Sequence, residues 1–143
     1  MPSYRLYIRA LLAELLAILS RNAYSGEEQS GLDHAAYDKI RPAIDYIRSE
    51  PGGDLSLSKL SDICCMSANY FSAYFKKVMA VNVSEYVEAV RIGRAQELLL
   101  TTTMPVTEIC YECGYKSISS FNTAFRKVSG ATPRAYRKQY DKS

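Results

Sequence analysis

The feature that most constrains the fold of this 143-residue chain is a sequence pattern that occurs twice. Matching residues lie 50 positions apart; the pairs are Phe71 and Phe121, Phe75 and Phe125, Lys76 and Arg126, Lys77 and Lys127, Val78 and Val128, and Tyr86 and Tyr136. Upstream the offset is 49, where Leu60 matches Ile109 and Cys64 matches Cys113, so the second copy carries one extra residue in a turn. This period indicates a duplicated supersecondary unit, and two copies are too few for a solenoid.

Each copy is predicted to form a short helix, a tight turn and a longer helix. In the first copy, Ser67 is a suitable N-cap for the longer helix, which carries Tyr70, Phe71, Tyr74, Phe75 and Val78. Of these, Phe71, Tyr74 and Phe75 are expected to face inward. In the second copy, Gly114 tolerates a positive φ in the turn, and the longer helix is expected over about residues 119–129. Both longer helices end in two basic residues. This pattern is typical of a helix-turn-helix, whose second helix lies in a major groove while nearby cations contact phosphate.

Three stretches carry a family resemblance: LSLSKLSDICCMSANYFSAYFKK, SEYVEAVRIGRAQELLL and VTEICYECGYKSISSFNTAFRKVSGATPRAYR. Over roughly residues 40–140 the chain resembles the DNA-binding domain of the AraC/XylS family of bacterial transcription regulators. The third stretch is the most specific, because a helix-turn-helix followed by F-R-K, S-G-x-T-P and Y-R in that order rarely arises by chance. The resemblance implies an all-α domain over residues 33–143, with helix-turn-helix units at about 57–79 and 106–129.

A linker helix is expected between the two units, over about residues 84–100, with Ser84 as its N-cap. About 17 residues at a rise of 1.5 Å form a rod of roughly 25 Å. Such a rod holds two recognition helices at a fixed separation, so that they face successive major-groove turns about 34 Å apart. One chain is therefore expected to contact two consecutive grooves.

Residues 1–32 are interpreted as an N-terminal amphipathic helix over residues 4–19 followed by a flexible linker over residues 21–31. The resemblance implies that they are the remnant of a sensor and dimerisation domain. The chain is then a fragment or a shortened relative, with homodimerisation through residues 4–20 and a small-molecule effector bound only by the missing domain. The alternative is that this helix packs back onto the DNA-binding domain.

A supporting helix is predicted over residues 33–50, with Pro42 either in its first turn or at a kink. Pro51, Gly52 and Gly53 are expected to end it.

Charge is unevenly distributed along the chain. From Asp54 onward there are 12 Lys and Arg residues against 8 Asp and Glu residues, whereas the preceding part has 6 against 7. The basic excess lies on the repeat, as phosphate binding requires, although charge alone fits a merely soluble domain equally well.

Base contacts are predicted from the side of each recognition helix that faces away from the phenylalanines: Asn69, Ser72, Ala73, Ser119, Ser120, Asn122 and Thr123. Asparagine bonds adenine N6 and N7 in a bidentate manner, and Ser and Thr meet donors or acceptors. Ala73 and Thr123 depart from the family, whose members often carry a guanine-reading Arg there, so we expect a preference for adenine, thymine methyl groups and DNA shape. Taken alone, these polar residues also fit an ordinary solvated helix face.

Phosphate contacts are predicted for the cations in or beside the recognition helices: Lys76, Lys77, Lys116, Arg126, Lys127, Arg134 and Arg137. Arg91 and Arg94 lie on the linker helix. Arg94 is as well explained by a structural role, since long basic side chains often cover apolar surface.

Four cysteines support a competing hypothesis, a thiol- or metal-responsive sensor. Cys64, Cys110 and Cys113 fall on apolar positions of the repeat, where free cysteine commonly acts as a small buried residue, and Cys65 falls in the turn. Adjacent cysteines and one helical C-x-x-C suit tetrahedral zinc poorly, so no metal site is expected.

No enzyme activity and no cofactor are predicted, because His34 is the only histidine and no nucleotide-binding or metalloprotease motif is present. A helical protein-interaction module is the other alternative, suggested by the apolar stripe of residues 4–19. The longest apolar run is too short and too charged to span a bilayer, so a cytoplasmic, nucleoid-associated location is expected. The favoured hypothesis is a sequence-specific DNA-binding regulator of transcription, and the resemblance implies an activator with RNA polymerase as partner.

Overall fold

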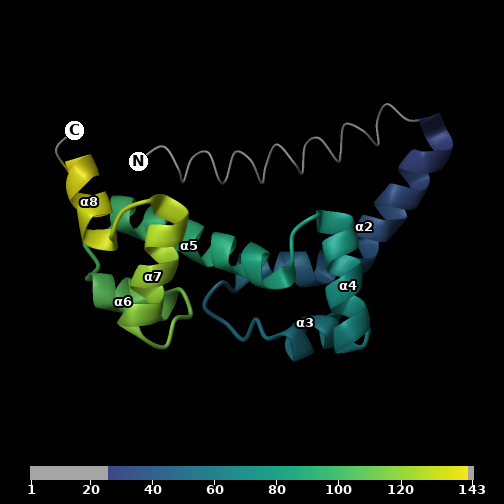
Figure 1. Ribbon diagram of the computed structural model, residues 1–143, viewed down its shortest axis with the longest axis horizontal. Helices are drawn as coiled ribbons and strands as arrows, with labels where there is room; N and C mark the ends of the chain where they lie inside the picture. Colours follow the sequence, from purple (N-terminus) through teal and green to yellow (C-terminus); the bar gives the residue numbers. More distant parts are fainter. Residues whose placement is uncertain (1–25, 142–143) are drawn as a thin grey trace.

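The computed structural model describes residues 26–141. These residues form seven α-helices and no strand (Figure 1). The helices are α2 (Gly26–Ser49), α3 (Leu57–Ile63), α4 (Ala68–Met79), α5 (Val83–Thr101), α6 (Val106–Glu112), α7 (Ile118–Ser129) and α8 (Pro133–Asp141). None of these helices is long and apolar enough to cross a membrane. The all-α prediction is confirmed, and the helix predicted over residues 4–19 lies outside the described residues.

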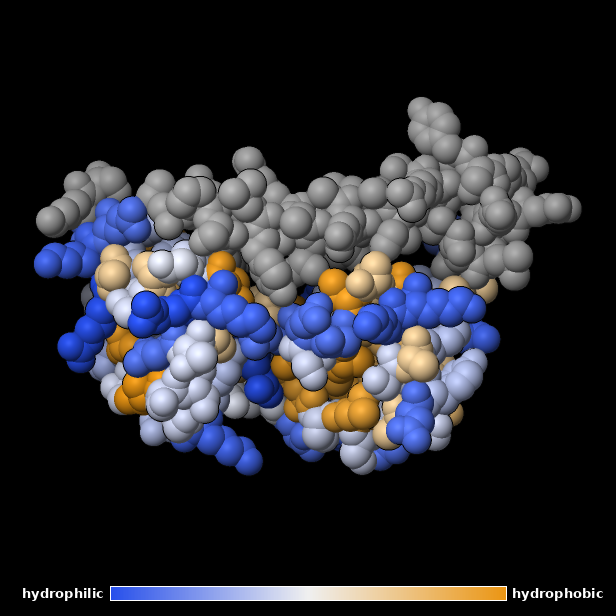
Figure 2. All heavy atoms as spheres, viewed as in Figure 1, coloured by the Kyte–Doolittle hydropathy of each residue, from blue (hydrophilic) through white to orange (hydrophobic). Residues whose placement is uncertain are grey.

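The helices form two subdomains with the same arrangement. The first subdomain contains α2, α3, α4 and the first turns of α5, and the second contains the later turns of α5 with α6, α7 and α8. Figure 2 shows them as two lobes with a notch between them along one edge. The first core is Ile40, Ala43, Ile44, Ile47, Leu55, Leu60, Phe71, Phe75, Met79, Val83, Tyr86 and Val87. The second core is Ile92, Ala95, Leu98, Leu99, Ile109, Cys110, Cys113, Phe121, Ala124, Phe125, Val128 and Tyr136.

Helix α5 belongs to both cores and is therefore more than a spacer. Val83 and Tyr86 are buried in the first core, whereas Ile92 and Leu99 are buried in the second. The helix has 19 residues, or about 28 Å at the usual rise. Its N-cap is Asn82 rather than the predicted Ser84, because the Asn82 side-chain oxygen accepts a 2.9 Å hydrogen bond from the Glu85 amide.

The two helix-turn-helix turns differ by the one residue that the repeat predicts. Residues 64–67 connect α3 to α4, and residues 113–117 connect α6 to α7. The Met66 amide donates to the Ser61 carbonyl at 2.9 Å, and the Tyr115 amide donates to the Cys110 carbonyl at 3.1 Å, so these turns are equivalent up to that point. Each recognition helix then begins at a serine N-cap, Ser67 or Ser117. Lys116 is therefore the residue without a counterpart.

The supporting helix α2 begins at Gly26, earlier than the predicted residue 33. The prediction of a flexible linker is wrong for residues 26–31, which are helical. Glu, Gln and Ala upstream of the buried segment have adequate helix propensity, so a helix anchored by Ile40 and Ile44 extends toward the N-terminus. Pro42 lies inside this helix and not in its first turn.

Candidate nucleic-acid interface

The recognition helices α4 and α7 are each 12 residues long and are attached to opposite ends of α5 (Figure 1). Phe71 and Phe75 of α4 are completely buried, as are Phe121 and Phe125 of α7. These phenylalanines anchor one face of each helix in its own core. The opposite face of each helix is consequently held outward.

The polar residues predicted on α4 lie on this outward side. Asn69 and Ala73 are exposed and Ser72 is half-buried. Tyr70 is 55% exposed and stacks on Tyr74 with 5.7 Å between ring centroids. The repeat contained a signal for this, because the counterpart of Tyr70 in the second copy is the polar Ser120.

The polar residues predicted on α7 lie together on its exposed side. Ser119, Asn122 and Thr123 line a shallow groove with Ile118 and Arg126. The hydrogen bonds that these side chains make within the protein determine which of their donors and acceptors remain free for a ligand. The Thr123 hydroxyl donates to the Ser119 carbonyl at 2.9 Å, which leaves its lone pairs and methyl group exposed.

Ser120 keeps a hydroxyl proton for an outside acceptor. Its Oγ accepts a 2.9 Å hydrogen bond from Ser117 Oγ, the cap of the helix. Asn122 is half-buried and also lines a second groove with Thr107 and Arg134. The α7 face thus combines donors, acceptors and one cation within a short distance of each other.

The cations predicted to contact phosphate are exposed, with the exception of Arg137, which is half-buried. Lys76, Lys77, Lys116, Arg126 and Arg134 are exposed. Lys127 is also exposed, but its Nζ lies 3.3 Å from Glu88 Oε1 on α5. The basic pairs of α4 and α7 lie in the last turns, where a helix dipole favours cations, so they also contribute to helix stability.

Arg137 has a structural role that the sequence did not indicate. Its Nε donates to the Leu99 carbonyl at 3.1 Å, and its Nη2 donates to the Thr102 carbonyl at 3.2 Å. The last carbonyls of a helix have no partner within the helix, and Arg137 supplies donors at the end of α5. Two of the guanidinium nitrogens of Arg137 are therefore engaged within the protein.

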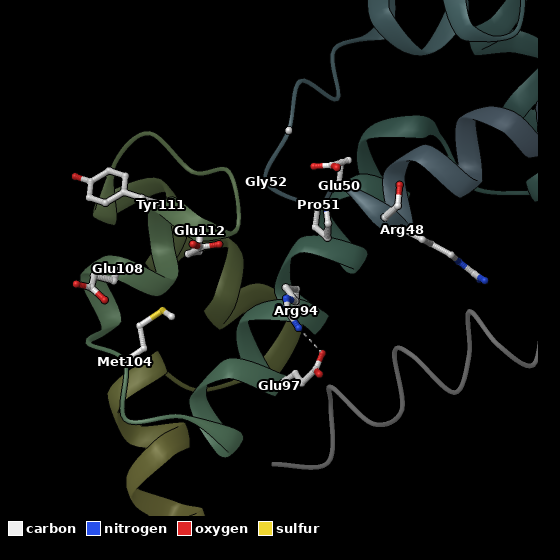
Figure 3. A pocket seen from close by; sticks show the side chains of 12 residues that line it. Arg48, Glu50, Pro51, Gly52, Arg94, Glu97, Met104, Glu108, Tyr111 and Glu112 are labelled. Atoms are coloured by element: carbon white, nitrogen blue, oxygen red, sulfur yellow. Dashed lines mark hydrogen bonds and ion pairs between the residues drawn. The ribbon is translucent and has the colours of Figure 1, made fainter.

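The two arginines of α5 also differ. Arg94 is exposed, and its Nη1 forms an ion pair with Glu97 Oε2 at 3.1 Å. Figure 3 shows this pair in the cleft between the subdomains, opposite Glu108 and Glu112 of α6. Arg91 is half-buried and points to the loop after α2, where its Nε donates to the Pro51 carbonyl at 3.0 Å.

The cysteines give little support to thiol chemistry. Burial raises the pKa of the Cys113 thiol to about 12 and also raises the pKa of Cys64 and Cys110, so the reactive thiolate is disfavoured. Cys65 is exposed, in the turn where it was predicted. Among residues 34–141, whose side chains the structure describes, no three His, Cys, Asp or Glu side chains are grouped to hold a metal ion.

A family model described as a helix-turn-helix domain matches residues 60–139. YijO, an uncharacterized HTH-type transcriptional regulator of Escherichia coli K12, is 28% identical over 139 residues, which cover 97% of this chain and 48% of that relative. The chain spans less than half the length of the first curated relatives it matches, namely 12% and 48%.

Two solved structures share the fold. The C-terminal domain of AraT, a response regulator from Geobacillus stearothermophilus, is 31% identical with a TM-score of 0.67, covering 71% of this chain and 84% of that one. The DNA-binding domain of AdpA, a global transcriptional factor, was solved in complex with a target DNA. It is similar at a TM-score of 0.70 and 23% identity, covering 73% of this chain and 94% of that one, and at this identity the likeness concerns the fold alone.

Proposed function

We propose a mode of DNA recognition for this chain, which belongs to the AraC/XylS family of helix-turn-helix transcriptional regulators. In this mode α4 and α7 enter two successive major grooves on one side of a promoter. The observation that carries the proposal is the duplication itself. Two equivalent helices, each with a buried phenylalanine face and an outward polar face, are attached to opposite ends of one shared helix.

Base contacts are assigned to the outward residues of both recognition helices, which are Asn69, Ser72, Ala73, Ser119, Ser120, Asn122 and Thr123. The Thr123 methyl group suits a thymine methyl, and the Asn122 amide suits adenine N6 and N7. No arginine is present among these residues. The preferred bases are therefore adenine and thymine, with DNA shape as a further contribution.

Phosphate contacts are assigned to the exposed cations, which are Lys76, Lys77, Lys116, Arg126, Lys127 and Arg134. Lys127 reaches phosphate only in competition with Glu88, so its contribution is smaller. Lys116, the extra residue of the second turn, gives the second subdomain a cation that the first lacks at the equivalent place. These contacts fix position and make affinity depend on salt, and they carry no sequence information.

The wider role follows from the family. We propose that the chain activates transcription through contact with RNA polymerase, in the cytoplasm and at the nucleoid, and that residues 4–20 mediate homodimerisation. Effector binding is assigned to a sensor domain outside this chain. Of these roles, activation of transcription requires DNA binding first.

Selection of binding sites from random DNA duplexes tests this proposal. The wild-type chain is expected to select two half-sites about one helical turn apart, with adenine and thymine at the contacted positions. A matched variant carrying Ser119→Ala, Asn122→Ala and Thr123→Ala is expected to select only the half-site contacted by α4. A single half-site for the wild-type chain would contradict two-groove binding, and a core dominated by guanine would contradict the assigned base contacts.

Retention on a DNA-affinity resin at moderate salt separates this function from the alternative of a protein-interaction module. A DNA-binding protein is retained and is released as salt rises, because counterion release drives its binding. An interaction module passes through the resin.

A further inference from the structure

The two subdomains touch each other at a point that is not on the shared helix. The loop after α2 approaches the end of α6, where a Cβ on Gly52 would lie 2.2 Å from the Glu112 carbonyl oxygen. Only glycine permits so close an approach of two backbones. Figure 3 shows Pro51 and Gly52 on this loop and Glu112 on α6, all lining the same cleft.

Arg91 of α5 contacts both sides of this junction. Toward the first subdomain, its Nε donates to the Pro51 carbonyl at 3.0 Å and its Nη2 donates to the Gly53 carbonyl at 3.2 Å. Toward the second, its Cζ lies 5.8 Å from the centroid of the Tyr115 ring, in a cation–π arrangement. A Cβ on Gly114 would lie 3.0 Å from the same Cζ. One side chain thus joins a loop of the first subdomain to the turn of the second.

Other extensive contacts between helices lie within one subdomain or involve α5. A single helix about 28 Å long does not by itself fix the angle between the two subdomains packed on its ends, because helices of this length can curve gently. The contact at Gly52 and Arg91 is a second connection between the subdomains, away from the axis of α5. It resists both bending of the helix and rotation of one subdomain relative to the other. The planar guanidinium is suited to this task, since it donates to two carbonyls and stacks on an aromatic ring at the same time.

We propose that Arg91 is a positioning residue that fixes the separation and orientation of α4 and α7, and so determines which half-site spacing the protein accepts. The proposal rests on the two-groove binding proposed above. One inserted base pair moves a half-site by about 3.4 Å and turns it by about 34° around the duplex. A protein with two fixed recognition helices cannot follow both changes.

The first test needs no DNA. Residual dipolar couplings of backbone amides are measured for the wild-type chain, for Arg91→Gln and for the control Arg94→Gln, which removes the same charge from the same helix. One alignment tensor is expected to fit both subdomains of the wild type and the control, whereas Arg91→Gln requires two. A single tensor for folded Arg91→Gln overturns the proposal.

The second test uses the duplex that the wild-type chain selects, with zero, one or two base pairs inserted between the half-sites. Affinity of the wild type and of Arg94→Gln is expected to fall on the order of 100-fold with one insertion, because the second contact is lost. Arg91→Gln binds the original duplex more weakly but loses less than about tenfold on insertion. Equal losses in all three proteins overturn the inference alone, whereas failure of the wild type to select any duplex overturns two-groove binding and the spacing role together.

A second pair of variants tests the same junction without altering charge. Gly52→Ala places a methyl group against the Glu112 carbonyl across the junction. A Cβ on Gly53 meets only atoms of the first subdomain, with Glu50 O at 3.2 Å and Tyr46 Oη at 3.5 Å. Gly52→Ala is expected to change the preferred spacing and the fitted tensors, and Gly53→Ala to leave both unchanged. Unchanged spacing in folded Gly52→Ala contradicts the proposal, and circular dichroism establishes that each variant is folded.

Discussion

The first and second subdomains have the same helices in the same order but use different residues at equivalent places. The second has glycine at both left-handed positions, Gly114 with φ of +92° and Gly130 with φ of +78°. The first has Cys65 with φ of +55° and Ala80 with φ of +63°. A residue with a Cβ costs roughly 1–2 kcal/mol in this conformation, so the first subdomain carries the backbone strain.

The difference between the two cores is that the less favourable feature, a buried polar pair, lies in the second subdomain. Ile40, Ala43, Ile44 and Ile47 of α2 correspond, 52 positions on, to Ile92, Ala95, Gln96 and Leu99 of α5. Ile44 and Met79 of the first core are thus replaced by Gln96 and Ser129, whose side chains form a buried 2.7 Å hydrogen bond. Gln96 Oε1 has no partner among the described residues. One fold therefore tolerates strain in the backbone of one copy and a polar pair in the core of the other.

The largest effect is expected from Gly114→Ala, which gives the second turn the same strain as the first. Its φ of +92° lies beyond the usual left-handed region, and the new Cβ meets the Arg91 guanidinium at 3.0 Å. We expect the free energy of unfolding to fall by about 2–3 kcal/mol, measured by urea denaturation. Cys65→Ala is the control, because that position already holds a side chain, and an equal loss there would contradict the explanation.

Ser129→Ala removes the partner of the buried Gln96 amide. We expect the free energy of unfolding to fall by about 2 kcal/mol, because an unsatisfied buried donor retains its desolvation cost. Introducing the first core's pair, Gln96→Ile with Ser129→Met, is expected to recover most of this loss in urea denaturation. A double variant no more stable than Ser129→Ala would show that the two cores are not interchangeable.

The halves are also expected to recognise bases differently, because Asn122 of α7 corresponds to Ser72 of α4. Asn122→Ser should reduce discrimination by about 1–2 kcal/mol at one or two base pairs of the α7 half-site, since the bidentate contact is lost. Binding to single-base variants of the selected duplex measures it. The control Arg126→Ala should weaken binding to all of these duplexes and flatten the salt dependence; a uniform effect of Asn122→Ser would assign it to phosphate instead.

Alkaline pH is expected to destabilise the second subdomain through Cys113. Burial raises the pKa of its thiol from 9.0 to about 12, so above pH 9 the unfolded chain loses a proton that the folded chain keeps. This contribution is complete below pH 9 and decreases as pH rises toward 12, with about 1 kcal/mol lost by pH 10. Urea denaturation at pH 8 and 10 should show a smaller decrease for Cys113→Ala. If Cys113→Ala lost as much stability as the wild type between pH 8 and 10, the Cys113 thiol could not be the cause of the loss.

The smallest effect is a gain. Cys65→Gly and Ala80→Gly each relieve a left-handed non-glycine residue, but glycine also adds entropy to the unfolded chain. We expect each to raise the free energy of unfolding by about 0.5 kcal/mol in urea denaturation. The converse change Gly130→Ala should lower the free energy of unfolding. If Gly130→Ala raised it instead, the claim that backbone strain is confined to the first subdomain would be contradicted.

Much of the fold was predictable because the repeat aligns the two copies against each other. Phe71 with Phe121 identifies a core position in both copies and Ser67 a helix cap in the first, and the structure has them there. The outward position of Asn69 and Thr123 followed from the buried phenylalanines through helical geometry. Whether these residues contact bases stays a prediction.

Local pattern misjudged the features that depend on a distant partner. Arg137 looks like any surface cation until the end of α5 is placed beside it. The start of α2 was missed because helix propagation from a buried segment overrides a polar, glycine-containing sequence.

The sequence by itself determined two helix-turn-helix units, the cap of the first recognition helix and the one-residue difference between the two turns, because hydrophobic period and capping chemistry act over a few residues. Only the tertiary structure decided that α5 belongs to both cores and that Arg91 joins the two subdomains beside the contact of Gly52 with Glu112. Those contacts join residues that are far apart in the chain. Their formation depends on where packing brings two backbones together, which no local pattern encodes.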